Sequence, residues 1–311
     1  SICSAIGYMI HGFKPKEGLA VIAVDHQISA DKTEANGRTG KSIVGECFQY
    51  LKKVLKVDGR EFDEKNKFKF GELKADHKII AMQDCKHNLD FGTFFVPLTN
   101  DFTYTQLYLG SITIPFRDSP KFWFDTNFTF KGQGDSFEAR QFVIEFDNYF
   151  NKNYKPKQEF GHYLFDDWDE AQWEKFYCFM FDCVQIYLSE GLVPYPDSNY
   201  GKRKMLQEMP ADFYDWANAK EESTNDFANY KINGWNSKKV MLAAWSKEAN
   251  DLNMMRTSSN QFYKWIKNYC KNENLFFETY KMAGGTNGPG EMYWIGTEPP
   301  KEKPRNKAYY F

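Results

Sequence analysis

Several features that mark other protein classes are missing from these 311 residues. No window approaches the roughly 18 consecutive apolar residues that a membrane-spanning helix needs, so we expect no membrane partner. The 40 Lys and Arg residues are offset by 42 Asp and Glu residues, and the formal net charge of −2 gives no bulk argument for nucleic acid. The six cysteines and five histidines lack paired or ligand-like spacing, which argues against a disulfide framework or a zinc site and favours free thiols in a reducing cytoplasm.

The length and the changes in composition along the chain predict two folded parts, since a domain usually takes about 100–200 residues. A start at Ser1 without an initiator Met or a basic leader leads us to expect a piece of a longer protein. The expected divisions are a nucleotide-binding domain over 1–193, a helical connector over 194–234, a small domain over 235–298 and an extended tail over 299–311.

Apolar runs in the first part predict buried parallel strands, because strands covered on both faces are almost continuously hydrophobic. Three such runs occur at 19–25, 78–82 and 121–126. Helical spacing over 41–56 and 169–188 separates or follows them. Strands alternating with helices indicate an α/β fold around a central, mainly parallel sheet.

A phosphate-binding loop is the strongest motif, because it follows a predicted strand and precedes a predicted helix. In such a loop, backbone N–H groups surround the β-phosphate, and the following helix adds its dipole. We expect Lys41 to reach the β- and γ-phosphates of ATP, and the Ser42 hydroxyl to ligate Mg²⁺. Ala35 stands where the usual motif has its first glycine. The expected nucleotide-binding residues are Asn36, Gly37, Arg38, Thr39, Gly40, Lys41 and Ser42.

Two polar residues at the ends of the next predicted strands complete the expected site. Asp84 follows the strand at 78–82 and is our candidate for the acid that holds Mg²⁺ and polarises the attacking water. Asn127 follows the strand at 121–126, and its amide can orient that water. A strand-end acid capping a loop and a turn-forming Asn are the alternative readings of these two residues.

The order and spacing of Lys41, Asp84 and Asn127 resemble a superfamily 3 helicase. The sequence is similar to the helicase half of the primase–helicases of bacteriophages and of integrated elements in Bacteroides-type bacteria. The resemblance extends over roughly residues 5–195. The similar stretches are 34–42, 98–103, 119–127, 134–140 and 159–168.

This resemblance implies an AAA+ core that hydrolyses ATP at the subunit interfaces of a hexameric ring and moves along DNA in a bacterial host cytoplasm. Arg140 matches the family's arginine finger, which a neighbouring subunit would supply to stabilise transition-state charge. It also implies that a primase region could precede Ser1 in the full-length protein.

Three departures from the family pattern keep a second interpretation open. Gln83 replaces the first of two strand-end acids, Ala139 replaces the first of two arginines, and the hairpin segment 104–110 has no lysine. Tyr104 and Tyr108 in that segment could stack on bases, although strand positions are the preferred reading. The alternative function is an ATP-binding DNA-binding or assembly module with weak or no hydrolysis; a different P-loop enzyme, such as a small-molecule kinase, is disfavoured.

The predicted small domain resembles a winged helix in its order of elements. Ser237 and Ser258 can each cap a helix, and two short strands then flank the Gly-rich stretch 283–290. Between Lys231 and Lys281 there are nine Lys or Arg and four Asp or Glu, a local charge of +5. We therefore expect DNA contact by the helix around 258–270 and by the Gly-rich wing, with packing between subunits as the alternative.

Overall fold

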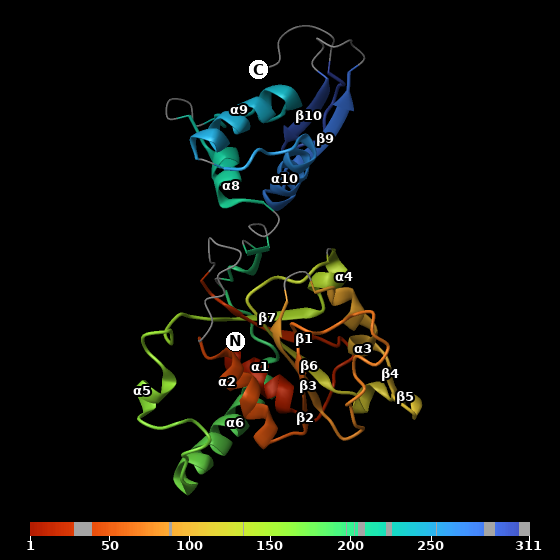
Figure 1. Ribbon diagram of the computed structural model, residues 1–311, viewed down its shortest axis with the longest axis vertical. Helices are drawn as coiled ribbons and strands as arrows, with labels where there is room; N and C mark the ends of the chain where they lie inside the picture. Colours follow the sequence, from red (N-terminus) through yellow and green to blue (C-terminus); the bar gives the residue numbers. More distant parts are fainter. Residues whose placement is uncertain are drawn as a thin grey trace. The chain divides into compact units, whose positions relative to one another are not determined.

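The computed structural model describes residues 1–27, 39–86, 89–132, 134–196, 198–201, 203–204, 209–221, 226–252, 254–282 and 290–304. The chain divides into two compact units, Ser1–Arg203 and Lys204–Phe311. Each unit has its own hydrophobic core and is described separately below (Figure 1).

A five-stranded parallel sheet forms the centre of the first unit, in the order β2-β3-β6-β1-β7 (Figure 1). The α/β class with a central parallel sheet, predicted from the apolar runs, is confirmed. The strands are β1 (Ala20–Asp25), β2 (Val54–Asp58), β3 (Ile79–Cys85), β6 (Lys121–Thr126) and β7 (Gln141–Phe146).

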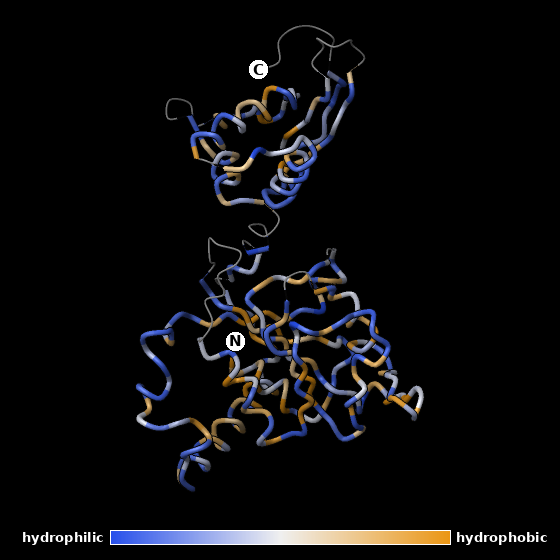
Figure 2. Tube along the Cα trace, in the orientation of Figure 1, coloured by the Kyte–Doolittle hydropathy of each residue, from blue (hydrophilic) through white to orange (hydrophobic). Residues whose placement is uncertain are grey.

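The two inner strands β1 and β6 are buried along their whole length, as expected for strands covered on both faces. One face packs under α1 (Ile2–Ile10), α2 (Lys41–Cys47) and α6 (Glu170–Glu190), and the hydrophobic stretches converge there (Figure 2). Gly7 lets α1 approach α6, because a Cβ at that position would lie 2.0 Å from the carbonyl oxygen of Cys183. The other face is rich in phenylalanine, including Phe91, Phe94 and Phe124.

The helix predicted over 41–56 is wrong beyond its first half. The α-helix α2 ends at Cys47, a short 3-10 turn covers Phe48–Tyr50, and Val54–Asp58 is the edge strand β2. Among the described strands, β2 pairs with β3 alone, and its side chains alternate between buried and exposed positions. Leu55 of this strand also fits the helical spacing of the preceding residues, which is why the pattern predicted a longer helix.

Short elements connect the sheet strands of the first unit. They include α3 (Phe95–Thr99), the hairpin β4 (Phe102–Gln106) with β5 (Gly110–Ile114), α4 (Asp135–Glu138) and α5 (Pro156–Phe160). In the hairpin, Tyr104 is a buried strand residue, as preferred. Tyr108 instead lies in the turn, with a φ of 66°, and is 96% exposed.

The described residues of the second unit include the helices α8, α9 and α10 and a small antiparallel sheet in the order β8-β10-β9. Its elements run α8 (Ala211–Asn218), β8 (Gly234–Ser237), α9 (Lys238–Asp251), α10 (Ser259–Asn272), β9 (Phe276–Lys281) and β10 (Glu291–Gly296). The cap predicted at Ser258 is confirmed, because its hydroxyl accepts a hydrogen bond from the Gln261 N–H at 3.2 Å. Helix α8, from the expected connector, contributes Phe213 to the core of this unit. The stretch 283–289 of the expected wing lies outside the described residues.

Candidate phosphate-binding site

The carboxyl ends of the neighbouring strands β1 and β6 bring the candidate polar residues together. Asp25 ends β1, Asp125 lies one residue before the end of β6, and Asn127 follows that strand. Lys41 opens α2, which packs against both strands. Parallel strands end at one edge of a sheet, and ligands of such folds characteristically bind at that edge.

Lys41 is a buried cation held by two side-chain oxygens. Its ammonium group donates to Asp25 Oδ1 and, at 2.7 Å, to Asn127 Oδ1. The side chains of Lys41 and Asp25 are only 6% and 4% exposed. A buried charge is costly without a partner, so the Asp25 and Asn127 oxygens stabilise the buried ammonium group of Lys41.

The residues just before Lys41 fix the shape of the loop. Gly40 has a φ of 101°, a left-handed conformation that glycine adopts without strain. The Thr39 hydroxyl donates to Asp25 Oδ1 at 2.5 Å, so the same carboxylate oxygen receives both Thr39 and Lys41. Three expected loop residues, Asn36, Gly37 and Arg38, lie outside the described residues.

Ser42 and Asp125 form the second polar pair of the site. The Ser42 hydroxyl donates to Asp125 Oδ2 at 3.0 Å. Burial raises the pKa of the Asp125 carboxyl to about 6, and Asp84 and Asp25 add to this rise, while Lys41 and the Ser42 hydrogen bond oppose it. Asp125 is therefore an anion at neutral pH that would be stabilised by an additional cation.

Asp84 points into the same region from an irregular part of β3. The register between β3 and β6 shifts between Met82 and Cys85, and Asp84 has a φ of 49°. Such bulges re-aim a side chain and are common beside active sites. Its carboxylate accepts a hydrogen bond from Arg60 Nη2 at 2.8 Å and is 56% exposed.

A cavity of about 570 Å³ joins these groups. Its lining includes Lys41, Ser42, Asp84, Asp125 and Asn127. Within the described parts of the chain, no cluster of three or more His, Cys, Asp or Glu residues could hold a metal by itself. The oxygen donors of Ser42 and Asp125 do suit Mg²⁺, which typically takes one or two protein ligands together with substrate phosphates and water.

Arg140 is not brought to this cavity in its own chain. It immediately precedes β7, whose first residue pairs with Ala20 at the start of β1, so Arg140 lies at the opposite edge of the sheet. Its guanidinium donates to the Ser136 carbonyl at 2.6 Å and lies 4.8 Å from the centre of the Phe95 ring. A role at the site would therefore have to be played in another copy.

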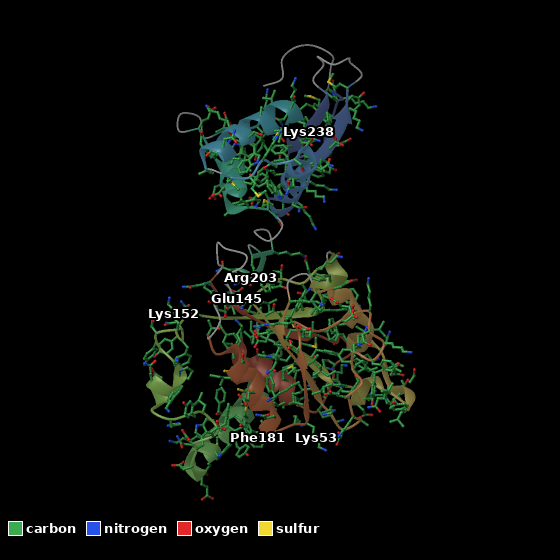
Figure 3. The ribbon with its side chains drawn as sticks, viewed as in Figure 1. Lys53, Glu145, Lys152, Phe181, Arg203 and Lys238 are labelled. Carbon is green, nitrogen blue, oxygen red and sulfur yellow. The ribbon has the colours of Figure 1, made fainter. Side chains whose placement is uncertain are left out.

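Arg203 is a site-supporting residue that sequence reasoning missed. Its buried guanidinium donates to the carbonyls of Asp25, Gln27 and, at 2.9 Å, Asn127. It thereby ties together the two loops whose side chains hold Lys41. Figure 3 labels Arg203 close to Glu145, whose charge opposes the lowering of the Arg203 pKa by burial. No local motif marks this arginine, because its partners are backbone groups about 75 or more residues away.

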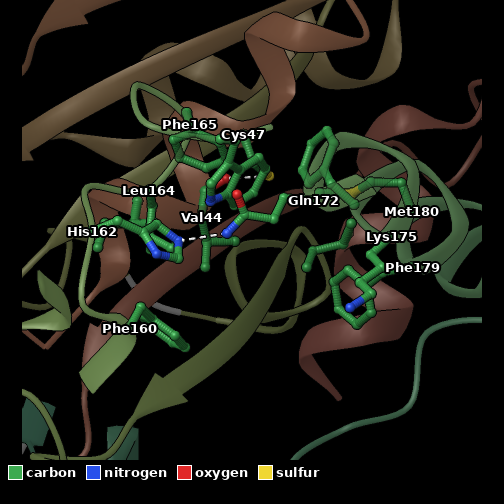
Figure 4. A pocket seen from close by; sticks show the side chains of 14 residues that line it. Val44, Cys47, Phe160, His162, Leu164, Phe165, Gln172, Lys175, Phe179 and Met180 are labelled. Carbon is green, nitrogen blue, oxygen red and sulfur yellow. Dashed lines mark hydrogen bonds between the residues drawn. The ribbon is translucent and has the colours of Figure 1, made fainter. Parts of the chain in front are cut away.

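A second, more apolar cavity of about 470 Å³ is lined mainly by residues of α2 and α6 and of the loop before α6. It shares Ile43, Leu164 and Phe165 with the first cavity. Most of its remaining lining is aromatic or aliphatic, and its polar feature is a 2.9 Å hydrogen bond between His162 and Gln172 (Figure 4). An apolar hollow beside a polar one is a common arrangement for a ligand with a flat ring and a charged group.

Comparison with known proteins does not assign a family. No protein-family model matches the chain, and no curated protein matches it. Among solved structures, one similar chain is described as "The A form apo structure of NrS-1 C terminal region-CTR", at 12% identity and a TM-score of 0.46. That alignment covers 94% of this chain and 71% of the other. In the described residues, no helix is long and apolar enough to cross a membrane.

Proposed function

We propose that the first unit binds ATP with Mg²⁺ and hydrolyses it, as a P-loop NTPase with an AAA+ core. The observation that carries this proposal is the buried Lys41, which opens the helix after β1 and is held by Asp25 and Asn127. The phosphate-loop motif in the sequence ends on this lysine and on Ser42. The same cavity is also lined by four acids, Glu46, Asp84, Asp125 and Asp166.

Lys41 can bind phosphate because phosphate oxygens can replace the Asp25 and Asn127 oxygens that now accept from its ammonium group. Asp25 keeps a second donor, Thr39, when the lysine turns to another anion. Oxygens of the β- and γ-phosphates can then take the place of the Asp25 and Asn127 oxygens on the ammonium group. Asn127, once released, can orient a water molecule toward the γ-phosphorus.

The sequence predicts that Ser42 and Asp84 hold Mg²⁺. Asp125 would take the place of Asp84 as the carboxylate ligand, because it lies within hydrogen-bonding distance of the Ser42 hydroxyl. Asp84 instead pairs with Arg60. When bound, Mg²⁺ neutralises charge on the β- and γ-phosphates. The exposed carboxylate of Asp84 would accept a proton from the attacking water as the bond between the γ-phosphorus and its bridging oxygen breaks. Arg140 from a neighbouring copy would stabilise the charge that develops.

The wider proposal is an ATP-dependent DNA helicase of phage or mobile-element replication, acting as a homohexamer in the cytoplasm of a bacterial host. Support for DNA contact comes from the second unit, whose helix–strand–helix–helix–strand–strand order is that of a winged helix. Its helix α10 exposes a row of polar side chains at helical spacing, comprising Asn260, Lys264, Lys267 and Lys271.

The hairpin of the first unit offers a second possible contact with DNA. Its turn carries Leu107, Tyr108 and Leu109, which are 60%, 96% and 73% exposed. An exposed tyrosine can stack on a base, which does not require the lysine that the family places there.

A second candidate function is an ATP-binding DNA-binding or assembly module with weak or no hydrolysis. Two observations favour it. Gln83 stands where the family has an acid, and Asp84 already pairs with Arg60. Both would reduce the ability of this strand end to activate water.

ATPase activity with and without single-stranded DNA, alongside the mass in solution, separates the candidates. We expect DNA-stimulated turnover by an oligomer, abolished in Lys41→Ala and unchanged in Lys16→Ala, an exposed lysine outside the cavity. ATP binding without turnover would favour the module. Turnover that ignores DNA but needs a small acceptor would favour a kinase, and wild-type turnover by a folded Lys41→Ala protein would contradict the site.

A further inference from the structure

The small sheet of the second unit has one face that its helices do not cover. Along the central strand β10, Tyr293 and Ile295 point into the helical core, so Trp294 between them faces the opposite way. Its partner across β8 is Trp235, with ring centres 5.7 Å apart. Tyr280 of β9 lies 6.2 Å from Trp235. These three rings form an aromatic face, which we define as Trp235, Trp294 and Tyr280.

The segment that follows β10 turns back over this aromatic face. The Trp294 indole N–H donates to the Glu298 carbonyl at 2.8 Å, and the Trp235 indole N–H donates to the Glu302 carbonyl at 2.9 Å. The ammonium group of Lys303 lies 5.7 Å from the centre of the Tyr280 ring. Both indoles thus bind backbone carbonyls four residues apart on a segment that bends at 297–298 and at 301–302.

The composition of that stretch matches a known mode of peptide recognition. Residues 298–304 read Glu-Pro-Pro-Lys-Glu-Lys-Pro, with three prolines. Proline-containing segments favour an extended polyproline II conformation, leave their carbonyls free and dock in grooves lined by aromatic rings. The half-buried indole N–H groups of Trp235 and Trp294 need acceptors, and the carbonyls of this segment supply them.

The segment does not fill the space beside the aromatic face. A cavity of about 670 Å³ lies there, bounded by Trp235 and Trp294 on one side and by the segment on the other. Its four charged lining residues, Glu298, Lys301, Glu302 and Lys303, all belong to the segment, and the lining outside the segment, Asn233, Trp235 and Trp294, is uncharged. A nucleic-acid backbone requires net positive charge, so this lining favours a neutral or mixed-charge ligand.

We propose that the aromatic face is a binding groove for a proline-containing peptide whose backbone carbonyls accept from the two indoles, and that residues 297–304 occupy it in cis. A partner carrying such a peptide would bind by displacing this segment. Because a segment tethered by a short linker acts at millimolar effective concentration, the groove is masked in the resting chain. The site is independent of ATP binding in the first unit.

The test uses a fluorescently labelled peptide with the sequence of residues 297–304. In the 311-residue chain, Pro299, Pro300 and Pro304 are replaced by glycine, which loosens the cis segment by removing the fixed φ angle of each proline. We expect this variant to bind the peptide at least tenfold more tightly than the wild-type chain. Adding Trp294→Phe should reverse the gain, whereas Trp173→Phe, in the first unit, should not.

Indole N–H resonances give a second measurement that does not depend on a substitution in the groove. The chain has eight tryptophans, and the peptide should shift the signals of Trp235 and Trp294 while leaving the other six in place. No binding to the proline-free variant at millimolar peptide would overturn the proposal. So would an oligothymidine that shifts the same two signals and displaces the peptide, since the groove would then bind nucleic acid.

Discussion

The central sheet buries lysine side chains both where its parallel strands end and where they begin. We call these two places the carboxyl edge and the amino edge, and they hold their lysines in different ways. At the carboxyl edge, Lys41 is paired with the carboxylate of Asp25. At the amino edge, Lys14 donates to the Ser119 hydroxyl at 2.6 Å and to two proline carbonyls. Lys121, the first residue of β6, donates to the carbonyls of Tyr8 and His11.

This difference indicates that the carboxyl edge can bind a ligand, whereas the amino edge has a structural role. At the amino edge, the acceptors are neutral groups that fasten α1 and the loop before β6, and nothing in that arrangement can be exchanged for an anion. Burial lowers the pKa of both Lys14 and Lys121 to about 7. At the carboxyl edge, an anion holds the cation, and a second anion of better geometry can replace it.

Replacing lysine at each edge should affect ATP binding very differently, and this is the largest expected effect. Lys41→Met should weaken ATP binding at least 100-fold and also lower the free energy of unfolding by about 3–5 kcal/mol, because Asp25 loses its counter-ion. The double variant Lys41→Met with Asp25→Asn should regain stability but not binding. Nucleotide titration and urea unfolding measure the two quantities.

The matched change at the amino edge is Lys121→Met. It should leave ATP binding within twofold and lower the free energy of unfolding by about 1–3 kcal/mol, because two buried carbonyls lose their donor. If Lys121→Met removed binding as completely as Lys41→Met does, the distinction between the edges would fail.

Replacing Arg140 should give the next largest effect, a loss of ATP hydrolysis. Arg140 lies at the amino edge of its own sheet, but we propose that it acts at the carboxyl edge of a neighbouring copy. Arg140→Ala should leave ATP binding intact and reduce hydrolysis at least 100-fold. Mixing inactive Arg140→Ala with inactive Lys41→Met should restore some turnover, since mixed interfaces contain one intact copy of each residue. No recovery despite confirmed mixing would argue against a finger supplied between subunits.

The raised pKa of Asp125 predicts a pH dependence at the carboxyl edge. Below pH 6 the carboxyl becomes neutral, so Mg²⁺-dependent ATP binding should weaken about tenfold between pH 7 and pH 5. Asp125→Asn should bind weakly at both values and lose this dependence. The stability of the chain without ligand should change with pH in the opposite direction to ATP binding. From about pH 4 to 6 the Asp125 carboxyl binds more protons in the folded state than in the unfolded chain, so the free energy of unfolding falls as pH rises across this range.

The amino edge predicts a pH dependence of stability in the opposite direction. The pKa values of Lys14 and Lys121 are near 7 in the folded state and 10.5 in the unfolded chain. Between about pH 7 and 10.5 these two lysines therefore bind fewer protons in the folded chain than in the unfolded chain. The free energy of unfolding should therefore rise with pH, by at most about 1.4 kcal/mol per unit and per lysine. Urea titrations at pH 7.5 and 9 measure it, and the rise should shrink in Lys14→Met. A stability that is flat or falls across this range would contradict the lowered pKa values.

The sequence was sufficient for the inner strands and the long helices. Strands β1 and β6 are continuous apolar runs, and α10 combines a serine cap with a clear helical period, so local pattern and final structure agree. Strand β2 was missed because an edge strand is only half buried, and Leu55 fitted the helical period of the preceding segment.

The candidate site was less fully predictable. Lys41, Ser42 and Asn127 follow from motif and strand-end position, but Asp25 and Asp125 were read only as strand residues. Their importance depends on β1 and β6 being neighbours, which no local signal states. Arg203 depends on backbone carbonyls of distant loops, and side-chain patterns carry no information about such partners.

Calorimetric titration of the 311-residue chain with a non-hydrolysable ATP analogue and Mg²⁺ tests the central claim most directly. The predicted result is one site per chain with micromolar affinity, lost in the Lys41→Met/Asp25→Asn variant while that variant stays as stable as the wild-type protein. Absence of binding to the wild-type chain, or equal binding to the double variant, would contradict the assignment of the carboxyl edge as a nucleotide site.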